Sequence, residues 1–197
     1  MAIQNPPGYL NVALHGKYYQ PTYASRQFSG GNQAVEATAL PAGLTASYTG
    51  GLVLYNPLAS TANLALNGAA FAFILAQTNA SVIGLGVGYS ATVAPTGTLT
   101  QITPQPGNPG SSATPQGLLY SSAAITLPVV PTLVRLLGVV DTGALTVGTL
   151  GASVNNDIGG AIILPPGGYV CFTSTAAGTA SSFLGSFTWE EIAAGQT

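Results

Sequence analysis

The sequence predicts an all-β protein folded as an antiparallel β-sandwich or barrel. Short apolar or alternating segments recur along its 197 residues, and turn residues separate them. The chain contains 26 glycines and 14 prolines, which the interiors of long helices exclude. No segment shows a clear amphipathic period of 3.6 residues. With 47% hydrophobic residues and a net charge of −2, the chain also differs from a disordered one.

The first clear strand is LVLY at residues 52–55, and the turn signal Asn56-Pro57 ends it. The next covers residues 64–76, an apolar run too short to cross a membrane as a helix, so we expect no membrane association. The later strands are separated by loops at 94–97, 104–115 and 174–182 and by the sharp turn Pro165-Pro166-Gly167-Gly168. They are predicted at residues 82–93, 117–127, 132–140, 144–150, 160–164, 169–174 and 183–189.

The segment 82–93 alternates large and small side chains, which is the period-two signature of a strand. Ile83, Leu85, Val87 and Tyr89 share one face. The opposite face carries a glycine row of Gly84, Gly86 and Gly88, with Ser90 after it. A row without side chains lets another backbone or an aromatic ring approach closely, so we expect such a contact here.

Charged residues are scarce, since the chain has only three Lys or Arg and five Asp or Glu. An average soluble domain is about one quarter charged. So few titratable groups argue against an enzyme, and there is no basic stripe for a nucleic acid. We expect no cofactor. A nearly uncharged surface is instead typical of a subunit that is buried against other subunits.

The N-terminal segment, residues 1–36, differs from the body at 37–197 because it is polar, aromatic and comparatively charged. One interpretation is a first strand with a solvated loop. The alternative that we prefer is an extended arm that docks on a neighbouring subunit, because Tyr and Arg are enriched at interface centres. Deleting residues 1–33 is then expected to leave the sandwich folded. The candidate docking residues are His15, Lys17, Tyr18, Tyr19, Tyr23, Arg26 and Phe28.

Three further motifs favour structural roles. The segment GVVDTGA at 138–144 resembles the active-site loop of retroviral-type aspartic proteases, with Asp141 as the catalytic acid. Too few residues follow it for that fold, so a turn is preferred. Cys171 lies in an apolar run and is expected to be a buried, inert thiol. Glu190 and Glu191 are neighbours on a strand, so they point to opposite faces and cannot act as a pair. One histidine among so few carboxylates predicts no metal site.

Four segments together carry a resemblance to a known group of proteins. They are LHGKYYQPTYASRQFSGGNQAV, GLVLYNP, LPPGGYVCFTST and GSFTWEEI, at residues 14–35, 51–57, 164–175 and 185–192. In this order they resemble a group of tailed-bacteriophage virion structural proteins. The resemblance implies a sandwich of jelly-roll type in a capsid-associated or decoration protein. It transfers no functional residue.

The sequence therefore predicts a non-enzymatic structural component of a bacteriophage particle. Its expected partners are identical subunits, arranged as a trimer, and other virion proteins such as the major capsid protein. The N-terminus lacks the basic start and apolar run of a signal peptide, so we expect assembly in the bacterial host cytoplasm. One alternative is a receptor- or glycan-binding head that recognises its target through polar loops such as 104–115. A remote alternative is the aspartic protease that uses Asp141.

Overall fold

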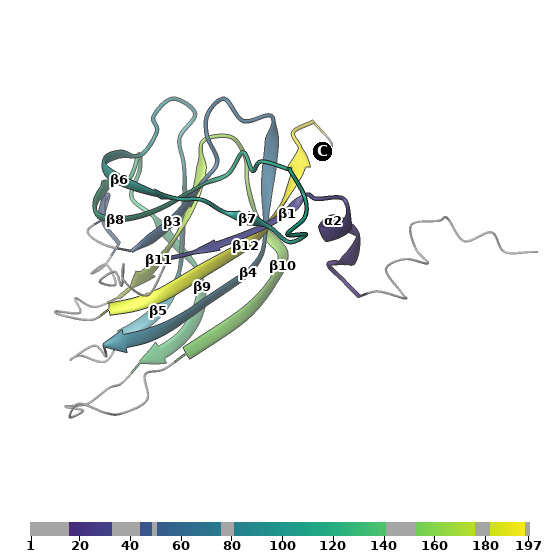
Figure 1. The fold of residues 1–197 in the computed structure, drawn as a ribbon. Coiled ribbons are helices and arrows are strands. Elements are labelled where there is room, and N and C mark those ends of the chain that lie inside the picture. The colour runs from purple at the N-terminus through teal and green to yellow at the C-terminus, as the bar shows by residue number, and fades with distance from the viewer. Residues whose placement is uncertain are drawn as a thin grey trace, which may run out of the picture.

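The prediction of an all-β sandwich is confirmed. The structure is a computed structural model that describes residues 16–32, 44–48, 51–75, 81–140, 153–175 and 182–195. Two antiparallel sheets face each other, and Figure 1 shows β4, β10 and β12 in one layer with β5 and β9 in the other. Only the five-residue α2 (Tyr19–Tyr23) is α-helical in the described part of the chain.

Each sheet collects strands that lie far apart in the sequence. The five-stranded sheet has the order β10 (Ser153–Leu164), β4 (Ala62–Leu75), β12 (Ser182–Ala193), β1 (Gln27–Gly31) and β7 (Gln105–Pro106). The seven-stranded sheet has the order β2 (Ser47–Tyr48), β8 (Leu118–Thr126), β3 (Leu52–Tyr55), β11 (Gly168–Ser174), β5 (Ser81–Tyr89) and β9 (Thr132–Val140), and β6 (Thr96–Ile102) pairs with β8.

Eight of these strands pair in a nested pattern. In chain order they are β1, β3, β4, β5, β9, β10, β11 and β12. The first pairs with the last, β1 with β12, and the second with the seventh, β3 with β11. The third pairs with the sixth, β4 with β10, and the fourth with the fifth, β5 with β9. All four pairs are antiparallel, so the chain follows the path of one long hairpin wound into two layers.

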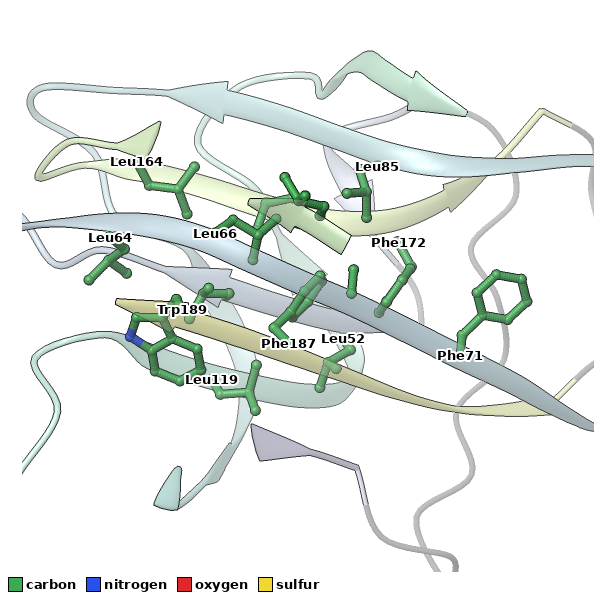
Figure 2. Packing of buried hydrophobic residues seen from close by; sticks show 14 of the residues in the cluster. Leu52, Leu64, Leu66, Phe71, Leu85, Leu119, Leu164, Phe172, Phe187 and Trp189 are labelled. Atoms are coloured by element: carbon green, nitrogen blue, oxygen red, sulfur yellow. The ribbon is translucent and has the colours of Figure 1, made fainter. Parts of the chain in front are cut away.

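The core lies between the two sheets and is rich in aromatic side chains. Phe172 of β11 stacks on Phe187 of β12, with ring centroids 4.6 Å apart and planes 10° from parallel. Trp189 is fully buried and lies 6.2 Å from the Phe28 ring. Figure 2 shows Phe172, Phe187 and Trp189 in the same layer, together with leucines from both sheets such as Leu52, Leu66 and Leu85. Successive side chains of a strand point to opposite faces, so every second residue enters this layer.

The turn at residues 165–168 joins β10 to β11, as the sequence predicts. The Gly168 amide donates to the carbonyl of Pro165 at 2.8 Å, and Gly167 has a φ of +89°. A proline followed by glycine at positive φ is the composition of a type II turn. The fully buried Asn56 side chain fastens this end of the sandwich, since its amide donates to the carbonyls of Ala62 and Leu164.

The expected close approach at the glycine row is also confirmed. A β-carbon on Gly88 would lie 2.5 Å from three atoms of the Tyr169 side chain, and one on Gly86 would lie 3.0 Å from Pro131. Tyr169 and Cys171 belong to a second buried cluster on the other face of the seven-stranded sheet. The Cys171 thiol is buried with no exposed surface, as predicted.

Some predicted boundaries differ from the structure. The segment 160–164 is only the end of β10, which starts at Ser153. The strand β6 was not predicted, since residues 94–97 were expected to form a loop and residues 98–102 were assigned to no element. These residues were missed because β6 is largely exposed and has no apolar alternation, so only its pairing with β8 makes it a strand. Asp141 and the strand predicted at 144–150 lie outside the described residues.

The N-terminal segment does not lie wholly outside the sandwich. Residues of β1 pair with both β12 and β7, and Phe28 is only 2% exposed. The prediction that deleting residues 1–33 leaves the sandwich folded is therefore at odds with the structure, because that deletion removes a strand and a core ring. The sequence hid this strand because QFSGG contains a single large apolar residue.

A short cap connects α2 to β1. The Ser25 amide donates to Thr22 and the Arg26 amide to Pro21, which is the hydrogen-bond pattern of a Schellman motif. Ser25 has a φ of +56°, in the left-handed region where that motif usually places glycine. The cap turns the chain from the helix into the sheet within three residues.

We predict that Gly88→Ala lowers the free energy of unfolding by about 1–3 kcal/mol, because the new methyl group would overlap the buried Tyr169 ring. The measurement is chemical denaturation. The matched control is Gly110→Ala, where the nearest atom would be 3.8 Å away and no loss is expected. Equal stability of the two variants would contradict the packing of the ring against the glycine row.

We predict that Phe28→Ala costs about 3–5 kcal/mol of folding free energy, because it empties a site in the core beside Trp189. Tyr23→Ala is the control, since that ring is 74% exposed and its removal should change stability by no more than about 0.5 kcal/mol. Denaturation of both variants checks the result. A Phe28→Ala variant as stable as wild type would instead support the prediction that residues 1–33 form an arm separate from the sandwich.

Candidate functional site

Residues 17–26 of the polar N-terminal segment lie against the outer face of the five-stranded sheet. Leu64 and Leu66 of β4 point into the core, so the intervening Ala65 points outward. Ala65 is nevertheless buried and lines a cavity together with Tyr18, Pro21 and Arg26. The α2 region therefore covers one end of this face, and the chain's few charges gather there.

Two ion pairs fasten this segment to the sheet. Lys17 Nζ lies 3.0 Å from Asp157 Oδ2, and Arg26 Nη2 lies 3.1 Å from Glu190 Oε1. Both side chains of the first pair are more than half exposed, whereas Glu190 is mostly covered. Four of the chain's eight charged residues are thus used to hold residues 17–26 in place.

Tyr18 adds a hydroxyl to the first pair. Its hydroxyl donates to Asp157 Oδ1 and lies 3.4 Å from the carbonyl oxygen of Asn67. These hydrogen bonds from the Tyr18 hydroxyl and the Lys17 ammonium hold the pKa of Asp157 below its ordinary value. The hydrogen bonds of Lys17 with Tyr18 and Asp157 raise the pKa of the lysine.

An irregularity in β10 makes room for this cluster. The pairing of β10 with β4 jumps from Asp157 to Ile162, so residues 158–161 form a bulge. Gly159 and Gly160 have φ values of +61° and +81°, and a β-carbon on Gly159 would lie 2.6 Å from Lys17 Nζ. The positive φ values favour glycine at both positions, and without a β-carbon Gly159 leaves the space that the lysine ammonium occupies.

Asn67 lies opposite this bulge. It has no partner on β12, because the register there passes from Gly68 directly to Leu66. The Asn67 side chain is 6% exposed, and its Nδ2 has no hydrogen-bond partner among the described residues. A buried amide without a partner is rare and costs about 1–3 kcal/mol, so it calls for an explanation.

A cavity of about 360 Å³ lies between the α2 segment and these strands. Its lining includes Lys17 of the first ion pair, both residues of the second and Asn67, and among its apolar residues are Ile163 and Ile192. We call it the α2 cavity. It is lined by Lys17, Tyr18, Gln20, Pro21, Arg26, Ala65, Asn67, Gly159, Gly160, Ile163, Glu190 and Ile192.

The structure divides the predicted docking residues into three groups. Lys17, Tyr18 and Arg26 contact their own sheet, and Phe28 belongs to the core. Tyr19 and Tyr23 are exposed on α2 and stack on each other, with ring centroids 5.8 Å apart. His15 lies outside the described residues.

The two C-terminal glutamates do point in different directions, as predicted. Glu190 binds Arg26, whereas Glu191 accepts hydrogen bonds from the Gln116 and Gly117 amides at 2.8 and 2.9 Å. The Trp189 indole also donates to Glu191, at 3.3 Å. Glu191 therefore anchors the end of the loop that precedes β8, and the two carboxylates form no catalytic pair.

Sequence reasoning missed Asp157, Asn67 and Glu190 as members of this site. Two local signals were present, because Asn67-Gly68 interrupts a long apolar strand and Gly159-Gly160 follows an aspartate. Both mark irregular strands. Neither signal indicates that the two irregularities lie side by side under the N-terminal segment.

Within the described part of the chain, no group of three or more His, Cys, Asp or Glu residues is placed to hold a metal ion. No helix there is long and apolar enough to cross a bilayer. Comparison of the chain with protein-family models, with curated protein sequences and with solved structures finds no match. Functional inference therefore rests on the geometry of the fold and of the α2 cavity.

We predict that Tyr18→Phe and Lys17→Met each raise the pKa of Asp157 toward its ordinary value. Because the pKa of Asp157 is lowered in the folded protein, the contact stabilises the fold fully at pH values above the ordinary carboxyl pKa. This stabilisation is lost as the pH falls through the lowered pKa. Carboxyl carbon signals in an NMR titration measure the shift. Tyr23→Phe, on the same helix but outside the cluster, should leave the pKa unchanged. An unchanged titration midpoint of Asp157 in both Tyr18→Phe and Lys17→Met would contradict its hydrogen bonds with these two residues.

Proposed function

We propose that the protein is a non-enzymatic structural component of a bacteriophage particle, capsid-associated or decorating the shell, that packs against identical copies. The observation that carries the proposal is a surface with exposed large apolar side chains and few charges, where every charged side chain that the structure describes contacts another part of the chain. The resemblance of the N-terminal, β3, β11 and β12 segments to virion structural proteins supports the same assignment.

The strand pairing supports a jelly-roll. A jelly-roll is a double sheet of eight strands in two Greek keys, and it is frequent in viral capsid and lectin domains. The nested pairs β1–β12, β3–β11, β4–β10 and β5–β9 follow the path of that fold. The strands β6 and β8 extend the seven-stranded sheet beyond β3. Fold alone does not fix function, so the surface has to carry the argument.

All six charged side chains that the structure describes make contacts within the chain. Four of them form the two ion pairs, Glu191 binds loop amides, and Arg135 Nη2 lies 3.3 Å from the Asp157 carbonyl oxygen. Little charge is therefore left to keep the remaining surface hydrated. Depletion of charge is what distinguishes the centre of an interface from ordinary surface.

The edge strand β9 is the surface that best fits a second copy. Its side chains Val134, Leu136 and Val139 are all large, apolar and exposed, and Leu136 and Val139 are 63% and 70% exposed. We call these three residues the β9 stripe. The neighbouring Arg135 is half-buried, and its guanidinium donates to the backbone carbonyl of Asp157. We place the β9 stripe between subunits of a trimer, with the exposed Tyr19 and Tyr23 available for a second contact.

We predict that Leu136→Asp combined with Val139→Asp weakens self-association at least tenfold, because each introduces a charge into an apolar contact. Light scattering coupled to gel filtration measures the mass. The matched control is Thr100→Asp with Gln101→Asp, two exposed positions on β6 in the same sheet, which should associate like wild type. Thermal unfolding checks that both variants remain folded.

Two outcomes would overturn the proposal. A wild-type protein that stays monomeric at every concentration, or a β9 variant with unchanged mass, would exclude packing through the stripe. The virion assignment has its own test, which is mass spectrometry and electron cryomicroscopy of purified particles. Absence of the chain from those particles would refute it.

A further inference from the structure

The α2 cavity combines a hollow with unused hydrogen-bonding capacity. Its volume of about 360 Å³ falls at the small end of the range of about 300–1,000 Å³ typical of ligand pockets. We propose that this cavity binds one neutral sugar ring. The proposal does not depend on a virion location, and it concerns different residues from the polar loops at 104–115.

The charges of the lining disfavour a charged ligand. Lys17, Arg26 and Glu190 line the cavity, and each already forms an ion pair, Lys17 with Asp157 and Arg26 with Glu190. A phosphate or carboxylate would meet Glu190 and compete with Asp157 for Lys17, and an amine would meet two basic side chains. A neutral ligand avoids both penalties and can still use the charged groups as strong hydrogen-bonding partners.

The hydrogen-bonding groups fit hydroxyls, which both donate and accept. Asn67 Nδ2 has no partner among the described residues, although its side chain is more than nine-tenths buried. Arg26 contacts Glu190 through Nη2, and its guanidinium carries further N–H donors. The Glu190 carboxylate supplies an acceptor. A bound hydroxyl that reaches Asn67 would recover the cost of its buried amide.

The apolar residues of the lining fit the rest of a sugar. Pro21, Ala65, Ile163 and Ile192 present carbon atoms, and Ile163 is 56% exposed at the rim. A pyranose has C–H groups on its ring faces and hydroxyls around its circumference. It can therefore place one face on the apolar wall while its edge meets the polar groups.

A second hollow in the same sheet lacks these features. It has a volume of about 430 Å³ and is lined mainly by small or apolar residues, among them Ala70, Ala72 and Leu184. Asn32, which also lines it, uses both side-chain atoms on β12, donating to Phe183 and accepting from Gly185. The α2 cavity is thus the better candidate for a polar ligand.

The test is an NMR titration of the full chain with isoleucine methyl groups labelled. The probes are methyl α-D-mannopyranoside, methyl β-D-glucopyranoside and N-acetyl-D-glucosamine at millimolar concentrations, with sodium phosphate and glycine as charged comparisons. We expect at least one sugar to shift the Ile163 and Ile192 methyl signals saturably, and neither charged probe to do so. Absence of shifts with all three sugars, or saturable shifts with phosphate or glycine instead, would overturn the proposal.

Two variants locate the binding. Asn67→Ala removes the unpartnered amide and Ile163→Asp places a charge on the apolar wall, so each should weaken the sugar about tenfold or more. Thr100→Asp on β6, an equally exposed strand position in the other sheet, should bind as wild type does. If Asn67→Ala fails to fold, the rim variant Ile163→Asp decides the matter. Wild-type affinity in every folded variant would refute this cavity as the site.

Discussion

The stacking of Phe172 on Phe187 is the contact on which the rest of the sandwich depends. The two rings come from β11 and β12, which are consecutive in the chain but lie in different sheets. Gly185 is required beside them, because a β-carbon there would lie 2.9 Å from the Phe172 ring. Once these rings face inward, strand alternation sends Tyr169 and Cys171 to the opposite side, where they form the second buried cluster.

The sequence predicts those parts of the fold that local patterns determine. The glycine row opposite Ile83 and Leu85 indicated both the strand and its close contact, because period two assigns each side chain to a face. The strand β1 could not be found in this way. QFSGG has one large apolar residue, and it becomes a strand only because β12 and β7 offer it hydrogen bonds on both sides. The residues that make β1 a strand are therefore far from it in the sequence.

The candidate site depends even more on residues that are distant in sequence, which local patterns do not link. Lys17, Tyr18 and Arg26 stand out in sequence as charged or aromatic residues before an uncharged body, which favours docking on another subunit. Their partners Asp157 and Glu190 are more than one hundred residues away, and no local pattern links them. Exposed ion pairs of this kind contribute little stability. They orient the N-terminal segment on the sheet and so define the hollow beneath it.

Trp189 gives this arrangement an optical consequence. It is the only tryptophan of the chain, and it is fully buried where the first and last strands of the sandwich pair. Its indole lies near Phe28 and donates to Glu191, which also holds the loop before β8. The emission of a single fluorophore therefore reports whether β1 is paired with β12. This pairing can thus be followed in real time, without any label, while subunits fold or assemble.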